Sequence, residues 1–191
     1  MLYKHYDGDG RARFVTFSLH RPLPVLADDR YCREVAKSVN HVREKYKFQL
    51  MGYVCMPEHV HLVLIPRTDT KVGEIVGEIK RQSSIAIHEL LNIGDPALLS
   101  DLFTYRNGAR RFVLWKRRCY DHNCRTPESM WQKVNYCHDN PVRRKLVAIP
   151  EEWQWSSCRW YLGYRDVPLM MDVDEAHPLG NAPSGCGTKK P

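Results

Sequence analysis

The stretch MPEHVHLVLIP, from Met56 to Pro66, contains the pattern from which the rest of the sequence is best interpreted. Side chains alternate between the two faces of a β-strand, so His59 and His61 share one face, about 6 to 7 Å apart along the strand. Val60, Leu62 and Leu64 form the opposite face, which is apolar and suitable for packing against helices. Paired histidines on a strand also occur as ordinary hydrogen-bonded side chains, but this spacing is suited to one divalent metal ion.

The flanking sequence predicts a sheet built around this strand. Pro57 and Glu58 form a tight turn between two strands, and periodic apolar residues predict helices that begin after Asp28 or Asp29 and at Lys71. Four segments have the alternation or the β-branched and aromatic character of strands: Arg13–His20, Phe48–Met56, His59–Ile65 and Phe112–His122.

The resulting order is strand, helix, strand, strand, helix, strand. It predicts an α+β, ferredoxin-like (split βαβ) fold, in which an antiparallel sheet carries both helices on one face and leaves the other face free. The stretch Asn92–Gly108 has no clear period and contains several turn residues, so we expect a connecting insertion with at most one helical turn.

A further helix is predicted within TPESMWQKVNYCHDNP. Thr126 is suited to the N-cap with Pro127 in the first helical position, and Pro141 is expected to end the helix at about Asn140. At 100° per residue, Tyr136 and Asn140 fall on a polar stripe nearly opposite the apolar side chains. A tyrosine usually packs, but this helical phase argues for a different role.

The composition favours a polyanionic partner. The 191 residues carry 29 Lys and Arg against 22 Asp and Glu, a formal net charge of +7, which makes nucleic acid the first candidate and an anionic membrane surface the second. No stretch is apolar enough to span a bilayer or to act as a signal peptide, so we expect a cytoplasmic protein. Residues 1–165 are expected to form a single domain and residues 166–191 a mobile tail.

The 7 cysteines are scattered and contain no CxxC pair, so they are expected to be reduced thiols. Cys119, Cys124, Cys137 and His138 could be imagined as a zinc cluster, but their spacing matches no usual zinc-ligand pattern. The dense aromatic residues after Pro141 are expected to close a small satellite core rather than to stack on bases.

Two histidines on a strand, a tyrosine on a polar helix face and an amide one turn later are suited to one reaction. A tyrosine hydroxyl can attack a phosphodiester if a metal ion polarises the phosphate, which gives a covalent phosphotyrosine. Asn140 offers an oxygen as a third ligand beside His59 and His61, a set compatible with Mg²⁺ or Mn²⁺.

Two motifs carry a resemblance to a known family. GYVCMPEHVHLVLIP resembles the metal-binding strand of the single-tyrosine HUH transposases of insertion sequences, in which U is a hydrophobic residue, here Val60. LWKRRCYDHNCRTPE, NYCHDNPVRRKLV and PEEWQWSS resemble more narrowly the REP-associated tyrosine transposases, whose tyrosine opens a YxHxNPV motif. The likeness spans roughly Phe14 to Tyr164.

The resemblance implies a ferredoxin-like HUH catalytic domain, cleavage and rejoining of single-stranded DNA at hairpin-forming repeats, and a 5′-phosphotyrosine intermediate. It makes Tyr136 the nucleophile and His59, His61 and Asn140 the ligands of Mg²⁺ or Mn²⁺, in a nucleoid-associated, bacterial-type protein that acts as a monomer or homodimer. The chain departs from the family pattern in two places. Lys145 replaces a glycine found in many relatives, and Asn92–Gly108 is longer than usual.

Basic residues near the two motifs are expected to hold phosphates without reading sequence. Lys133 could also act on the attacked phosphate or on the tyrosine hydroxyl, or it could be a solvated lysine. The predicted DNA-binding residues are Lys80, Arg81, Arg117, Arg118, Arg125, Lys133, Arg143 and Arg144.

Other functions remain open from the sequence. One is a non-catalytic nucleic-acid binding module that uses the free sheet face, although the paired aromatic motif of such modules is absent and the histidines would be unexplained. Another is a metal-dependent nuclease in which water attacks and Tyr136 only packs. A replication initiator with the same chemistry would need a further domain.

Overall fold

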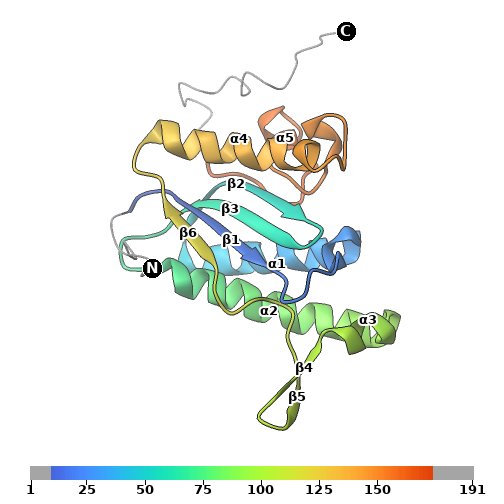
Figure 1. Cartoon of the computed structure of the whole chain (residues 1–191). Helices are drawn as coiled ribbons and strands as arrows, with labels where there is room; N and C mark the ends of the chain where they lie inside the picture. The colour runs from blue at the N-terminus through green and yellow to red at the C-terminus, as the bar shows by residue number, and fades with distance from the viewer. Residues whose placement is uncertain (1–9, 174–191) are drawn as a thin grey trace.

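The computed structural model of the chain describes residues 10–173, arranged around a four-stranded antiparallel sheet of order β2-β3-β1-β6 (Figure 1). This is the strand order and direction of the split βαβ plan, with β6 in the place of the fourth strand. The strands are β1 (Arg13–Ser18), β2 (Gln49–Met56), β3 (His59–Ile65), β4 (Phe103–Arg106), β5 (Ala109–Phe112) and β6 (Tyr120–Asn123). The α-helices are α1 (Asp29–Tyr46), α2 (Val72–Gly94), α3 (Pro96–Asp101), α4 (Pro127–Arg143) and α5 (Cys158–Tyr161), and the 3-10 turns are η1 (Val25–Ala27) and η2 (Pro150–Glu152).

Helices α1 and α2 cover one face of the sheet, as the sequence predicted. The alternate residues of β3 that were assigned to this face, Val60, Leu62 and Leu64, are buried in a core shared with both helices. The side chain of Asp28 accepts a hydrogen bond from the backbone N–H of Arg30 and caps α1, which confirms the predicted helix start.

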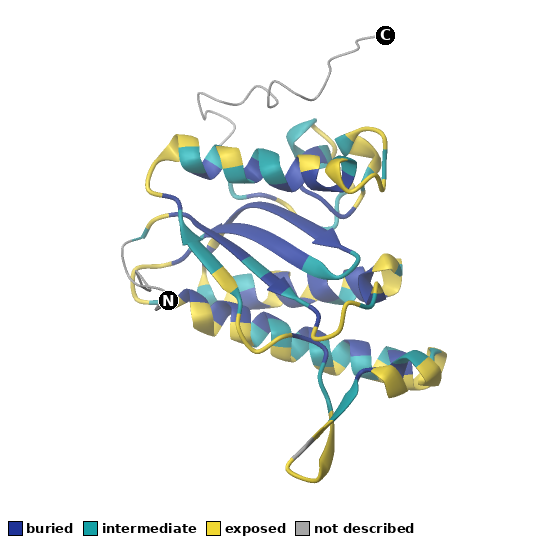
Figure 2. Cartoon of the chain, in the orientation of Figure 1, coloured by how far each residue is buried: buried dark blue, intermediate teal, exposed yellow. Residues whose placement is uncertain are grey.

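The other face of the sheet, which the sequence argument left free, is covered by α4 (Figure 1). Met130, Val134 and Cys137 of this helix form a second buried cluster with sheet residues such as Val63. Figure 2 shows β1, β2 and β3 almost wholly buried between the two layers of helices, whereas β6 at the edge of the sheet is partly exposed. The face that carries the two histidines therefore meets a helix rather than open solvent.

The predicted boundaries of helices and strands are wrong most clearly in the segment between α2 and α4. The stretch Asn92–Gly108 was expected to be a connecting insertion with one helical turn. It contains the short helix α3, but also the end of α2 and the first strand of a separate β4–β5 hairpin. The expected strand Phe112–His122 is also wrong in extent, because only Tyr120–Asn123 pairs with β1. Local propensity identified strand-forming residues there, but the choice of partner depends on tertiary contacts.

The C-terminal end of α4 also differs from the prediction. The helix continues through Pro141 to Arg143 and closes with a Schellman motif, in which the N–H of Leu146 donates to the carbonyl of Pro141 and that of Lys145 to the carbonyl of Val142, both at 2.9 Å. Proline removes one intrahelical hydrogen bond, but this loss is tolerated so close to the helix end. Lys145 occupies the left-handed position of the motif, with φ of 56°.

The substitution Lys145→Gly is expected to raise the free energy of unfolding by about 0.5–1 kcal/mol, because glycine adopts a positive φ without the steric cost that a Cβ atom brings. Lys145 is exposed, so little packing is lost with its side chain. Urea unfolding of the two proteins provides the measurement. Lys145→Ala is the matched control: it keeps the Cβ atom, and an equal gain in that variant would contradict the backbone explanation.

The chain after α4 runs along the free edge of β2. Backbone hydrogen bonds connect Cys55 to Trp155 and Ser157 to Tyr53. Residues 166–173 were expected to begin a mobile tail, but Leu169 and Met171 are buried against the core, and residues 174–191 lie outside the described part of the chain. Within residues 10–173 no helix is long and apolar enough to cross a membrane.

Candidate active site

Strand pairing determines which side chains surround the two histidines. In the antiparallel register of β1 and β3, Thr16 lies opposite His61 and Ser18 lies opposite His59. Residues directly opposite each other project from the same face of a sheet. The four side chains therefore form a polar patch on the face that α4 covers.

The imidazole nitrogens of this patch converge on one point. Nε2 of His59 lies 3.0 Å from Nε2 of His61, and the side-chain amide of Asn140 lies 3.2 Å from the same atom of His61. The Nδ1 atom of His61 is 2.7 Å from Oγ1 of Thr16. A proton on Nδ1, donated to the threonine hydroxyl, leaves the Nε2 lone pair available for a ligand.

Both histidines are held in the neutral state that a metal ligand requires. Burial, followed by the nearby His59 and Lys133, lowers the pKa of His61 to about 3. Burial also lowers the pKa of His59, against the opposing effect of the Glu58 carboxylate. Oε1 of Glu58 lies 3.4 Å from Nδ1 of His59 and forms a 2.7 Å ion pair with Arg144.

Tyr136 stands at the edge of the same patch. Its ring centre is 5.4 Å from that of His61 and 5.7 Å from that of Phe14, which it meets edge-on at 90°. The guanidinium of Arg143 lies 5.7 Å from the centre of the tyrosine ring. Within residues 10–173 the Tyr136 hydroxyl forms no hydrogen bond, so its oxygen is available to a substrate.

A pocket of about 340 Å³ opens between the strands and the C-terminal half of α4. Its walls combine the strand patch with side chains of the helix, so residues about 80 positions apart in the sequence meet in one cavity. The lining residues are Thr16, Ser18, His59, His61, Tyr136, Asn140, Arg143 and Arg144.

A buried hydrogen bond contributes to the position of α4. Nε2 of His138 lies 2.9 Å from Oγ of Ser157, and the same oxygen is 3.1 Å from the backbone N–H of Tyr53 on β2. His138 projects away from the patch while its neighbours Tyr136 and Asn140 line the pocket. Within YxHxN, His138 therefore connects one side of α4 to the edge of the sheet, while Tyr136 and Asn140 on the other side line the pocket.

The residues present fit a divalent metal ion. Two ligand atoms each about 2.1 Å from an octahedral ion and at right angles lie about 3 Å apart, which matches the separation of the two Nε2 atoms. Rotation of the Asn140 amide would turn its oxygen toward the same point. Within residues 10–173 no group of three or more His, Cys, Asp or Glu side chains could hold a metal ion, so the third protein ligand here would be the amide of Asn140.

Three of the predicted DNA-binding residues lie at the candidate site. Arg143 and Arg144 line the pocket, and Nζ of Lys133 is 5.0 Å from the centre of the Phe14 ring, beside Tyr136. These side chains place positive charge around the tyrosine and the histidines, where it would attract an anionic ligand.

Two other predicted residues are engaged elsewhere. Nζ of Lys80 donates to the backbone carbonyls of Lys116 at 2.6 Å and Arg117 at 3.0 Å, and burial lowers the pKa of its ammonium group. Arg81 is exposed and forms a two-point ion pair with Glu78 on α2. Lys80 therefore supports the chain after β5, and neither side chain lines the pocket.

The remaining predicted residues lie on separate surfaces. Arg117 and Arg118 are exposed just before β6, and Arg125 lines a different cavity at the start of α4. Thr16, Ser18 and Glu58 were not among the site residues predicted from the sequence. Thr16 could have been found, because it alternates with the apolar residues of β1, but its pairing with His61 depends on strand register.

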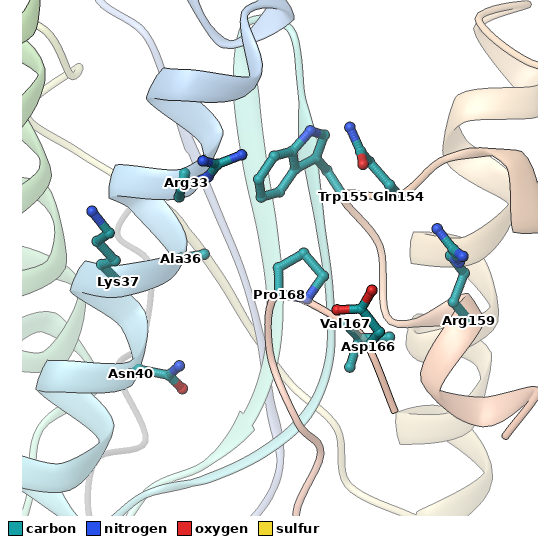
Figure 3. A pocket seen from close by; sticks show the side chains of 10 residues that line it. All are labelled: Arg33, Ala36, Lys37, Asn40, Gln154, Trp155, Arg159, Asp166, Val167 and Pro168. Carbon is teal, nitrogen blue, oxygen red and sulfur yellow. The ribbon is translucent and has the colours of Figure 1, made fainter. Parts of the chain in front are cut away.

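A second cavity, of about 300 Å³, lies between α1 and the chain after α4 (Figure 3). Figure 3 shows Arg33 on α1 at one side of this cavity and Arg159 at the other, with Trp155 between them. Its lining contains no histidine, cysteine or tyrosine, so it offers neither the nucleophile nor the metal ligands found beneath α4.

Comparison with known proteins supplies an independent line of evidence. The family model of IS200-like transposases matches residues 15–102, which include both histidines and end before Tyr136. A Haemophilus influenzae protein described as a candidate REP-associated tyrosine transposase is 24% identical over 167 residues, 86% of each chain. A solved structure of a REP-associated tyrosine transposase bound to a REP hairpin superposes with a TM-score of 0.67 at 20% identity, over 95% of this chain and 96% of that one, which shows a shared fold.

Proposed function

We propose that this chain cleaves and rejoins single-stranded DNA at hairpin-forming repeats through a covalent bond to Tyr136. Its similarity to the IS200-like and REP-associated tyrosine transposases supports this proposal. One observation carries the proposal: Tyr136 and Asn140 of α4 share a pocket with His59 and His61 of β3. A nucleophile, a candidate metal site and cationic side chains are thus assembled around one cavity that is open to solvent.

The proposed step exchanges one phosphoester for another. The Tyr136 oxygen attacks the phosphorus of a phosphodiester, the bond to the 3′ oxygen breaks, and a 3′ hydroxyl is released while the 5′ phosphate stays on the tyrosine. The phenolic proton passes to solvent, and the leaving 3′ oxygen takes up a proton in turn. Because the number of phosphoester bonds is unchanged, a 3′ hydroxyl can later reverse the step without ATP.

The surrounding side chains have distinct parts in this proposal. Arg143 and Arg144 would hold the phosphate beside the tyrosine, since their charges line the pocket. His59, His61 and Asn140 would hold a divalent ion, Mg²⁺ or Mn²⁺, whose chemistry here is to polarise a phosphate oxygen and neutralise charge. Thr16 and Glu58 would orient the two imidazoles through their Nδ1 atoms.

The proposed site is complete within one chain. The ring centres of Tyr136 and His61 lie 5.4 Å apart in a single protomer, so no tyrosine from a second subunit is needed to fill the pocket. The proposal is therefore compatible with a monomer, and equally with a homodimer whose two sites act separately.

Incubation of the wild-type protein with a single-stranded hairpin oligonucleotide and Mn²⁺ tests the proposed function. We expect a covalent protein–DNA adduct that survives denaturing electrophoresis and requires the metal ion. Cleavage without any adduct would support the nuclease alternative, in which water attacks. Binding without cleavage, at all metal concentrations, would support the non-catalytic binding module.

The structure weighs against that binding module in its simplest form. Such a module would present the free face of the sheet to nucleic acid, but Phe14, Val54 and Val63 on that face are buried beneath α4. Any base that stacked on these strands would have to displace the helix and its apolar contacts.

Thr16→Val provides a test of the orienting role of the threonine hydroxyl. Valine has nearly the same shape and suits a strand, but it cannot bond to Nδ1 of His61, so we expect Mn²⁺ affinity to fall by about 10- to 100-fold. Calorimetric titration with Mn²⁺ measures this change. Thr104→Val, a threonine on the separate β4–β5 hairpin, is the control. Unchanged affinity in Thr16→Val would show that the hydroxyl has no part in holding the imidazole.

A further inference from the structure

The β4–β5 hairpin is a projecting element that the proposed active site does not use. It forms its own two-stranded sheet and extends away from the body of the molecule beyond α2 and α3 (Figure 1). Figure 2 shows its outer part exposed. We refer to residues 103–112 as the arm.

The arm belongs to the most basic part of the sequence. Residues 102–120 contain six basic side chains, Arg106, Arg110, Arg111, Lys116, Arg117 and Arg118, and no acidic one. This stretch alone accounts for a charge of +6 in a chain whose formal net charge is +7. A polyanion attracted to the protein would therefore meet its strongest local field here.

The arm presents cations on both of its faces. Tyr105 pairs with Arg110 and Thr104 pairs with Arg111, and since cross-strand partners share a face, the two arginines project to opposite sides. Tyr105 is 79% exposed, which is unusual for a large aromatic ring. Within residues 10–173 neither arginine takes part in an ion pair.

The base of the arm holds it in one conformation. Phe112 packs against Phe103 and against His88 of α2, with ring centres 6.0 and 4.8 Å apart. At the tip, Asn107 and Gly108 have φ values of 50° and 73°, which is the two-residue turn that suits a hairpin twist. A preordered arm loses little conformational entropy when it binds a partner.

The chain leads from the arm directly to the proposed active site. Leu19 forms a bridge with Trp115, and the N–H of Lys116 donates at 2.9 Å to the carbonyl of Ser18, which lines the pocket. Lys116, Arg117 and Arg118 are exposed along this path. The backbone therefore passes from the arm to a strand that lines the pocket, and three exposed basic residues lie along this part of the chain.

We infer that the arm binds the duplex stem of the hairpin substrate, with its ribbon in a groove, while the adjoining single strand enters the pocket. The major groove of B-DNA, about 12 Å wide and 8.5 Å deep, admits a two-stranded ribbon. Each arm strand has four residues, so the arm projects about 10–13 Å. Cations on both faces would meet phosphates on both walls of the groove. This inference rests on the proposed function for the identity of the DNA.

The double variant Arg110→Gln, Arg111→Gln tests the inference by titration with three DNA probes: a hairpin with a single-stranded flank, the flank alone, and a blunt duplex of the stem sequence. Losing two phosphate contacts should make the plot of log K against log salt less steep by about 1.8, which corresponds to a loss of affinity of about 60-fold at about 0.1 M salt. We expect that loss for the hairpin and the duplex, and none for the flank.

Two further variants make the result specific. Arg33→Gln removes an exposed arginine at the second cavity and should leave binding to all three probes unchanged. Arg111→Gln alone keeps the guanidinium of Arg110 over the Phe103 ring, 4.1 Å from its centre, and should show about half of the change in slope. An equal loss on the flank alone, or no loss beyond that of Arg33→Gln, would overturn the inference.

Covalent chemistry is measured separately from binding. If the wild-type protein shows stem-dependent binding through the arm but forms no adduct with any probe, the tyrosine proposal fails and the arm inference stands. If wild type and variant form adducts on the flank at equal rates and bind the stem equally well, the arm inference fails and the tyrosine proposal stands.

Discussion

Tyr136→Phe is expected to abolish the covalent protein–DNA adduct and to lower strand cleavage at least about 10³-fold. The substitution removes only the oxygen that would attack the phosphorus, and phenylalanine retains the edge-on contact with Phe14. Because the Tyr136 hydroxyl forms no hydrogen bond within residues 10–173, its loss should change the free energy of unfolding by less than about 0.5 kcal/mol. Denaturing electrophoresis and urea unfolding measure the two effects.

Tyr164→Phe provides the matched control for this variant. Tyr164 is 47% exposed, the guanidinium of Arg159 lies 4.8 Å from the centre of its ring, and it does not line the pocket. The control should form adducts at the wild-type rate. An adduct that persisted in Tyr136→Phe would show that another side chain is the nucleophile. Cleavage that persisted without an adduct would favour attack by water.

His61→Ala is expected to weaken Mn²⁺ binding by at least about 100-fold, which is about 2.7 kcal/mol of binding free energy. His61 occupies the centre of the proposed ligand set, since its Nε2 atom lies within 3.2 Å of both His59 and Asn140. Calorimetric titration with Mn²⁺ reports the loss directly, without reference to DNA cleavage. We expect adduct formation to fall in parallel.

Alanine at this buried position also leaves a cavity, so a second variant is needed. His59→Gln changes a less buried ligand and should weaken Mn²⁺ binding in the same direction without a comparable loss of stability. His41→Ala, an exposed histidine on α1, is the control. Wild-type affinity in both His61→Ala and His59→Gln would exclude these residues as metal ligands.

The arrangement of α4 explains why the nucleophile and the metal ligands of the proposed site lie close together. The helix must bury Val134 and Cys137 against the sheet, and at 100° per residue this brings Tyr136 and Asn140 to one border of the contact. That border lies over the β1–β3 pair, where the histidines project. The apolar packing of the helix thus positions the nucleophile relative to the ligands, and changes in that packing should affect chemistry as well as stability.

Local patterns in the sequence determined the secondary-structure elements that build the sheet and the faces on which the candidate site residues lie. Alternation assigned Val60 and the histidines to opposite faces of β3, Asp28 and Thr126 marked the starts of α1 and α4, and helical phase placed Tyr136 beside Asn140. The order of elements was sufficient to predict the sheet topology. These features depend on contacts or periodicities within a few residues, which a sequence displays directly.

Only the tertiary structure decided how these parts meet. Thr16 faces His61 because of the register between β1 and β3, and Lys80 is occupied by carbonyls 36 and 37 residues away, which no local period records. The burial of the second sheet face beneath α4 likewise depends on contacts between distant segments. Such contacts are selected by the packing of the whole core, so the sequence identified the candidate catalytic residues while the fold determined their partners and brought them into one pocket.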